Sequence, residues 1–252
     1  MAGCISVERI LSKLDEYLNK NDYVSAERHL RYWLAEAVGG CDVRTELLIR
    51  NELMGLMRKL SRRDDALECV DAALSLIERE GIGEQVGAAT SFLNSATVYK
   101  AFGEAEKGMS LFERARAIYE RELDARDSRL GGLYNNMALA LVDLSRFDEA
   151  RELYSRAIEI MMANGGELEV AITYLNMASA AESELGLLDA DETICELLDK
   201  ARELLEGESE RDGYYAFVCE KCASVFDYYG QFLYAGELEA RARRIYEDNE
   251  GA

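Results

Sequence analysis

The sequence contains no proline and only one histidine among its 252 residues. At ordinary usage about a dozen prolines would be expected, and each would interrupt a helix or restrict a turn. The single histidine, His29, has no clustered partner for metal binding or acid–base catalysis, and we expect it to be a partly buried surface residue. No phosphate-cradling glycine loop, HExxH motif or nucleophile elbow is present. The sequence therefore favours a continuously helical chain and predicts no catalytic residue, metal site or cofactor.

Long apolar runs are also missing. No stretch of about 18 apolar residues occurs, so we expect no membrane-spanning helix. The opening MAGCISVERI has neither a basic head nor a long apolar segment, so no secretion signal is expected. The six cysteines form no disulfide framework, which fits a reducing, cytoplasmic location. Cys219 and Cys222 have C-x-x-C spacing, but we interpret both as small buried packing residues.

Basic residues are scarce relative to acidic ones. The sequence has 29 Lys and Arg against 49 Asp and Glu, a net charge of −20. Such a surface repels phosphate backbones and anionic lipids, so we expect neither nucleic acid nor membranes as partners. Most of the acids are equally well explained as solvated helix faces. A local basic turn at residues 58–63 would either dock an acidic segment or pair with nearby Asp64, Asp65 and Glu68.

The sequence is rich in amphipathic helical patterns, most clearly in the stretch from Leu133 to Ile160. Apolar and small residues recur there at helical spacing on both sides of a turn. They are Tyr134, Met137, Ala138 and Leu141 before the turn, and Phe147, Ala150, Tyr154 and Ala157 after it. One such hairpin cannot bury its outer faces, so similar hairpins should stack on it.

The hairpin recurs along the chain. A small residue near the start of each second helix marks the repeats at intervals of 40 to 45 residues: Ala26, Ala66, Gly108, Ala150, Ala190 and Ala235. The segments SFLNSATVY at 91–99 and TYLNMASAA at 173–181 match LYNNMALAL at 133–141. These matches predict six helix pairs, at about 5–37, 43–80, 84–123, 126–163, 167–206 and 211–248. Glycines such as Gly81, Gly131 and Gly132 are expected at left-handed helix ends between them.

This pattern resembles the tetratricopeptide repeat (TPR) family, and its long period resembles the kinesin-light-chain variety. The family's usual closing proline is absent from every repeat. The resemblance implies an all-α, right-handed superhelix, an α-solenoid of about six TPR-like helix hairpins, forming one domain over residues 1–252. It also implies a non-enzymatic module or scaffold whose concave groove holds an extended protein or peptide segment. A peptide-responsive regulatory subunit is an alternative.

Three asparagines, Asn94, Asn136 and Asn176, occupy the same place in the central repeats, two residues before an alanine. The resemblance implies that this place lines the groove, where an amide would bond the partner's backbone. An alternative is that the asparagines bridge adjacent first helices as a structural ladder. Asn135, Lys100, Asp143 and Glu182 are expected near the same groove. Because Lys100 is the one basic residue among them, a carboxylate clamp is not expected, and the groove suits a peptide with basic side chains.

The last two repeats depart from the pattern. The turn LGLLDADE of the fifth is short, and we expect a long second helix and a local offset there. The sixth is rich in aromatic residues and lacks a polar capping helix. We therefore expect self-association, such as a homodimer, through Tyr228 and Tyr229. The alternative is that the long side chains of Arg241, Arg243 and Arg244 shield this end of the repeat.

Overall fold

The computed structural model describes residues 6–250, which form twelve helices and no strand. The helices pair into six hairpins, and their outer ends differ from the expected ones by no more than two residues. The pairs are α1 (Val7–Asn19) with α2 (Tyr23–Gly39), α3 (Val43–Lys59) with α4 (Arg63–Glu80), α5 (Val86–Ala101) with α6 (Ala105–Glu122), α7 (Ser128–Asp143) with α8 (Phe147–Ala163), α9 (Glu167–Leu185) with α10 (Asp191–Gly207), and α11 (Gly213–Tyr228) with α12 (Phe232–Glu250). The expected all-α fold of six helix hairpins is therefore confirmed.

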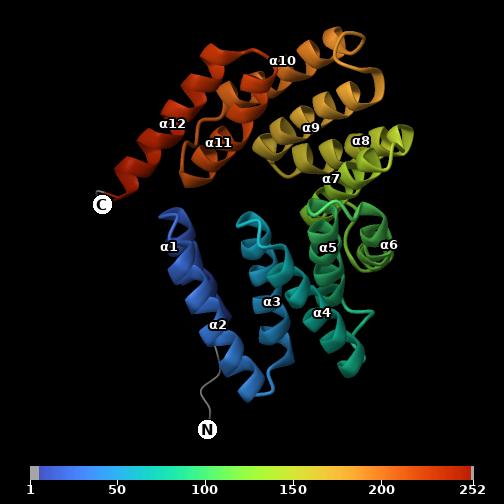
Figure 1. Cartoon of the computed structure of the whole chain (residues 1–252), viewed down its shortest axis with the longest axis vertical. Helices are drawn as coiled ribbons and strands as arrows, with labels where there is room; N and C mark the ends of the chain where they lie inside the picture. The colour runs from blue at the N-terminus through green and yellow to red at the C-terminus, as the bar shows by residue number, and fades with distance from the viewer. Residues whose placement is uncertain (1–5, 251–252) are drawn as a thin grey trace. The chain divides into compact units, whose positions relative to one another are not determined.

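The chain divides into two compact units, residues 1–125 and residues 126–252. Each unit contains three consecutive hairpins, α1–α6 in the first and α7–α12 in the second (Figure 1). None of the helices within residues 6–250 combines the length and apolar character needed to cross a membrane.

Five of the six hairpins share one turn geometry. Three residues separate their two helices, and the middle residue has a positive φ of 53° to 78°. These middle residues are Asn21, Ser61, Gly103, Ser145 and Gly230. The third residue then donates its N–H back across the helix end, as Arg146 does to the Leu141 carbonyl at 2.8 Å. This Schellman-type closure ends the first helix and points the chain back along it.

The small marker residues lie in the first turn of each second helix or directly before it. All six donate their N–H to the carbonyl four residues earlier, and the five alanines among them are buried. At the remaining marker, Gly108, a Cβ atom would lie only 2.9 Å from the carbonyl oxygen of Ala96. A small side chain is therefore required by backbone proximity.

Two glycines lie elsewhere than expected. Gly131 and Gly132 are inside α7 and not at a left-handed helix end. A Cβ on Gly131 would lie 3.1 Å from Cγ of Met161 on α8. Gly131 thus serves close helix packing, a use of glycine that sequence spacing does not distinguish from a cap.

The fifth hairpin turns differently. Its first helix, α9, has 19 residues against 16 or 17 in α3, α5, α7 and α11, whereas α10, with 17, is no longer than the other second helices. The expected extension is thus in the first helix and not in the second. Ala190 still bonds to the Gly186 carbonyl at 3.0 Å, so residues 187–190 follow a helical first turn. Five residues, 186–190, thus lie between the two helices, and the reversal begins at Gly186 with φ 83° and ψ 156°.

A cavity of about 240 Å³ lies where α8, α9 and α10 meet. Its walls are largely apolar and include Phe147, Met177 and Leu185, the last from the extended end of α9. Tyr154 also lines it and is 1% exposed, and its hydroxyl has no hydrogen-bond partner within the described residues. Burial raises the pKa of this phenol well above its usual range. The hydroxyl therefore bears a desolvation cost without compensation.

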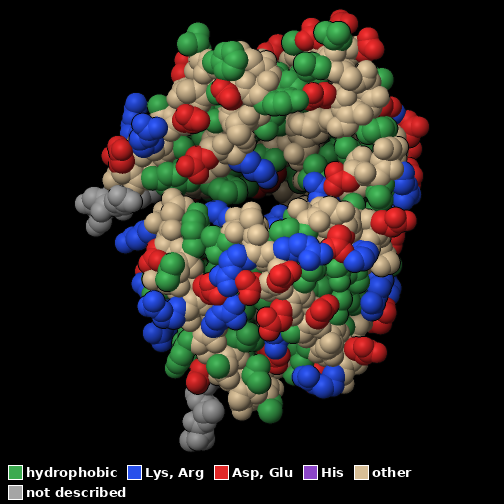
Figure 2. Space-filling model, in the orientation of Figure 1, with side chains coloured by type: hydrophobic (Ala, Val, Ile, Leu, Met, Phe, Trp, Pro, Cys, Tyr) green, Lys and Arg blue, Asp and Glu red, His purple; other side chains and the backbone are tan. Residues whose placement is uncertain are grey.

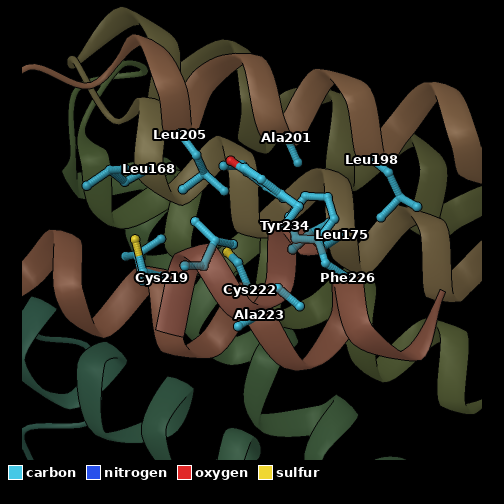
Figure 3. Close-up of a cluster of buried hydrophobic side chains, with 14 of the residues drawn as sticks. Leu168, Leu175, Leu198, Ala201, Leu205, Cys219, Cys222, Ala223, Phe226 and Tyr234 are labelled. Carbon is cyan, nitrogen blue, oxygen red and sulfur yellow. The ribbon is translucent and has the colours of Figure 1, made fainter. Parts of the chain in front are cut away.

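The core of the second unit joins its last two hairpins. Leu175 of α9, Leu198 of α10, Phe226 of α11 and Tyr234 of α12 meet in one buried cluster (Figure 3). Cys219 and Cys222 belong to the same cluster with 0% and 1% exposure. Both are free thiols, and burial raises the pKa of Cys222 to about 12. The expected packing role of this C-x-x-C pair is thus confirmed.

Gly108→Ala should lower the free energy of unfolding by about 1 to 3 kcal/mol, because the added methyl overpacks the contact with Ala96. Gly55→Ala in α3 is the matched control, since a Cβ there would meet no atom within 4 Å. That control should gain about 0.5 to 1 kcal/mol from helix propensity. Urea unfolding followed by circular dichroism measures both. Shifts of the same sign would contradict this account.

Tyr154→Phe should leave the stability unchanged or raise it by up to about 1 kcal/mol, because it removes an unpaired buried hydroxyl. Tyr134→Phe is the comparison: that hydroxyl accepts a bond from Nη2 of Arg156 at 2.8 Å. Its loss should cost about 0.5 to 1.5 kcal/mol. Thermal melts of the two variants test the difference, and a larger loss for Tyr154→Phe would refute it.

Candidate functional site

The first helices of the second unit carry most of the expected groove residues. Helix α9 packs against both α7 and α11, so these three first helices are neighbours. We use the name first-helix face for ten of the polar and aromatic side chains that they leave wholly or partly exposed. These are Asn135, Asn136, Glu169, Asn176, Glu182, Tyr214, Phe217, Lys221, Tyr228 and Tyr229.

An amide pair joins α7 to α9 on this face. Oδ1 of Asn135 accepts bonds from Nδ2 of Asn176 and from Oγ1 of Thr173, both at 3.3 Å. Asn136 instead donates to the Gly132 carbonyl of its own helix at 2.8 Å. The contact between helices therefore involves Asn135 and not Asn136, the residue that matches Asn176 in the repeat. Each half-buried amide retains further donor or acceptor positions after these bonds.

A carboxylate and two tyrosines join α9 to the end of α11. Oε1 of Glu182 accepts from the Tyr228 hydroxyl at 2.7 Å, and Oε2 accepts from the Tyr229 hydroxyl at 2.8 Å. The bond to Glu182 raises the pKa of Tyr228; burial and then the same carboxylate raise that of Tyr229. Both phenols are thus held as neutral donors. The structure brings together Glu182, expected in the groove, and the two tyrosines expected to self-associate.

A second carboxylate–tyrosine contact lies at the opposite end of the same two helices. Oε1 of Glu169 accepts from the Tyr214 hydroxyl at 2.8 Å. The Tyr214 ring stacks on Phe217 at 6.2 Å between centroids, and the two residues are 44% and 40% exposed. Burial and then the bond to Glu169 raise the pKa of Tyr214. Sequence reasoning missed this cluster as a site, although residues 214, 217, 221 and 228 recur at helical spacing.

The remaining expected groove residues lie apart from these contacts. Asp143 is the last residue of α7 and is exposed. Asn94 and Lys100 belong to α5 in the unit of residues 1–125, where both are half-buried. The Asn94 amide makes no hydrogen bond to another residue of the described chain, in contrast to Asn136 and Asn176.

The basic turn of residues 58–63 pairs with acidic neighbours. Nε of Arg62 lies 2.7 Å from Asp65, and its guanidinium also pairs with Glu27. Arg63 pairs with Glu104 and Asp64. These contacts agree with the interpretation as a charged turn. Acidic and basic side chains are likewise interspersed over the visible face in Figure 2.

Neither His29 nor the carboxylates form a metal cluster. His29 Nε2 lies 3.0 Å from the Ile10 carbonyl, and its ring meets Tyr17 and Trp33 edge-on. Within residues 6–248, whose side chains are described, no group of three or more His, Cys, Asp or Glu is placed to hold a metal ion.

The sixth hairpin buries many of its aromatic residues but leaves others exposed. Tyr215, Phe226 and Tyr234 lie in the core cluster. Arg241 covers part of that end by pairing with Glu206 at 2.6 Å and donating to the Tyr215 hydroxyl at 3.2 Å. Tyr229 is half-buried, whereas Tyr228 is 68% exposed. The turn into α12 also exposes two apolar side chains, Phe232 at 66% and Leu233 at 89%.

The similarities of this chain to known proteins agree with its repeat pattern. No protein-family model matches the chain. It is 22% identical over 231 residues to the Arabidopsis thaliana protein KINESIN LIGHT CHAIN-RELATED 3, an alignment that covers 76% of this chain. The alignment covers 36% of the plant protein, so the chain spans about a third of that relative's length.

Two solved structures share the fold. The crystal structure of BtubC (BKLC) from P. vanneervenii matches with a TM-score of 0.57 and 19% identity over 93% of both chains. A Podosopora anserina protein, described as a kinesin light chain with nearly identical TPR-like repeats, matches with a TM-score of 0.55 and 17% identity. That match covers 83% of this chain and 99% of the other. The chain therefore has the tetratricopeptide-type helical-repeat fold, in the long-period form that resembles kinesin light chains.

Proposed function

We propose that this protein is a non-enzymatic binding module that holds an extended segment of a partner protein against the first-helix face of residues 126–252. One observation carries the proposal. Glu182 fixes the hydroxyls of both Tyr228 and Tyr229, and Tyr228 stays 68% exposed. A ring that is exposed and already positioned loses little conformational freedom on binding, which favours affinity.

The amides on the same face supply a second kind of contact. Asn176 donates one hydrogen bond to Asn135, which uses one donor of Asn176 and one acceptor position of Asn135. Their remaining positions suit a peptide unit, which also presents a donor and an acceptor in one plane. These amide contacts would read no side chain of the segment, so any preference for its sequence would come from other residues of the face.

The comparisons support a scaffold role only through the shared fold, since TPR-like repeats are platforms for protein interaction. The scaffold role is also supported by the helices that carry the face. They pack on one another and hold its side chains more rigidly than loops would. A cytoplasmic location is part of the proposal. It rests on the free thiols of all five cysteines in the described chain.

Asn135→Ala combined with Asn176→Ala should weaken partner binding tenfold or more while changing the melting temperature by less than about 2 °C, if the amides serve a partner. Affinity capture from the native cell, followed by mass spectrometry, identifies the partner, and titration calorimetry then measures its Kd. Asn164→Ala is the matched control, because its amide bonds the Ile160 carbonyl of α8 and the Arg126 carbonyl before α7 and no residue of the first-helix face. Intact binding with a large loss of stability would show that the pair is a structural ladder.

A second candidate function is self-assembly through the sixth hairpin. It is favoured by the exposed Tyr228, Phe232 and Leu233, which are close in sequence at the α11–α12 turn. Apolar side chains gathered in this way often mark an interface.

Phe232→Ser with Leu233→Ser should convert an oligomer to a monomer, and the same result is expected when Tyr228 and Tyr229 are made polar. Sedimentation velocity at tens of micromolar provides the measurement. Val24→Ser, at a 70% exposed site in the other unit, controls for the loss of apolar surface. A wild-type protein that sediments as a strict monomer would eliminate self-assembly.

A further inference from the structure

The first-helix face carries two clusters that combine a carboxylate with aromatic rings. The Glu169 cluster consists of Glu169, Tyr214 and Phe217, and the Glu182 cluster consists of Glu182, Tyr228 and Tyr229. In both, a carboxylate on α9 accepts tyrosine hydroxyls from α11 at 2.7 to 2.8 Å. The Tyr228 and Tyr229 rings meet edge-on with centroids 5.0 Å apart, and Tyr214 stacks on Phe217.

Each cluster has the chemistry that binds a basic side chain. A carboxylate offers about four acceptor positions, and one or two phenol donors leave the others available. The exposed rings of Tyr214 and Tyr228 beside these carboxylates attract a cation through their quadrupole. A Lys ammonium or an Arg guanidinium satisfies both requirements together, whereas an acidic side chain meets repulsion. The net charge of −20 adds a long-range attraction for basic segments.

The distance between the two clusters can be estimated along α9 and, separately, along α11. Glu169 and Glu182 are 13 residues apart on α9, which corresponds to about 20 Å at 1.5 Å per residue. Tyr214 and Tyr228 are 14 residues apart on α11, which gives about 21 Å. An extended chain advances about 3.3 Å per residue, so about six residues would span the interval.

A basic side chain of α11 lies between the clusters. The two helices keep one register, because their bonded pairs are 45 and 46 residues apart in sequence. In that register, Lys221 of α11 lies level with residues 175–176 of α9. Lys221 is exposed, and Asn176 is bonded to Asn135. A third basic residue midway along the partner would therefore meet a like charge, while a neutral or acidic residue would not.

We propose that the partner segment carries two basic side chains about six residues apart, with no basic residue midway, one bound at each cluster. This inference rests on the proposed function, and it adds the chemistry and spacing by which the partner is recognised. It favours a protein segment with paired Lys or Arg over a neutral or acidic one.

Fluorescein-labelled nine-residue peptides test the spacing, measured by anisotropy at 50 mM salt against the full chain. The first peptide has Arg at positions 2 and 8 and Ala or Ser elsewhere; the second has Arg at positions 2 and 5; the third has Glu at positions 2 and 8. The first should bind at least fivefold tighter than the second, and the third should not bind. Equal binding of the first two, or failure of the first to bind, would overturn the inference.

Charge-neutral variants locate the site. Glu182→Gln and Glu169→Gln should each weaken the first peptide at least fivefold, because each removes one carboxylate from a cluster. Glu184→Gln is the matched control: it removes the same charge from the same helix, but Glu184 lines the α8–α9–α10 cavity and pairs with Arg151. An equal loss of affinity for the first peptide in Glu184→Gln would show that the effect comes from net charge alone, and it would refute the proposed site.

An unbiased selection separates this inference from the proposed function. A random 12-residue peptide library displayed on phage is selected against the wild-type chain. Enrichment of two basic residues five to seven positions apart supports the inference. Enriched peptides without that pair, whose binding is lost in the Asn135→Ala, Asn176→Ala variant, keep the proposed function and overturn the inference. A selection that enriches nothing counts against both.

Discussion

Close packing around one small residue at the start of each second helix is the constraint on which the other features depend. At Gly108 the carbonyl of Ala96 leaves no room for a methyl group, and buried alanines occupy the corresponding places in the other hairpins. A small residue at a fixed distance from the turn sets the rotational phase of both helices. The polar side chains of successive first helices are thereby brought to the same side of the stack.

That phase explains how the proposed binding surface is built from helices and not from loops. Helices α7, α9 and α11 contribute corresponding positions, so residues about 41 to 46 apart in sequence become neighbours. Carboxylate–tyrosine bonds then link the exposed layer of α9 to that of α11. The packing that buries the core therefore also fixes the positions of these surface side chains, because it sets the register between neighbouring repeats.

Most of the fold could be predicted from the sequence, because small residues and turns recur at a readable period. The six hairpins followed from that period alone, whereas the role of Gly131 did not, since a packing glycine and a capping glycine look alike in sequence. The contacts of the candidate site could be predicted less well from the sequence. That Asn135, and not Asn136, bonds Asn176 depends on the rotation of α7 against α9. The link from Glu182 to Tyr228 depends on the register between α9 and α11, which periodicity specifies only to within a residue or two.

The turn at Gly186 has a consequence for how the chain tolerates change in length. In the five regular hairpins three residues connect the helices, and a polar residue such as Asn21 or Ser145 adopts the left-handed conformation. In the fifth hairpin five residues, 186–190, connect the helices, and Gly186 has backbone angles that are open essentially to glycine alone. A change that puts another residue in the place of Gly186 would disturb those angles and shift α10 against α9. The regular turns are thus the natural places for tags and grafted loops, and the fifth is the one to leave intact.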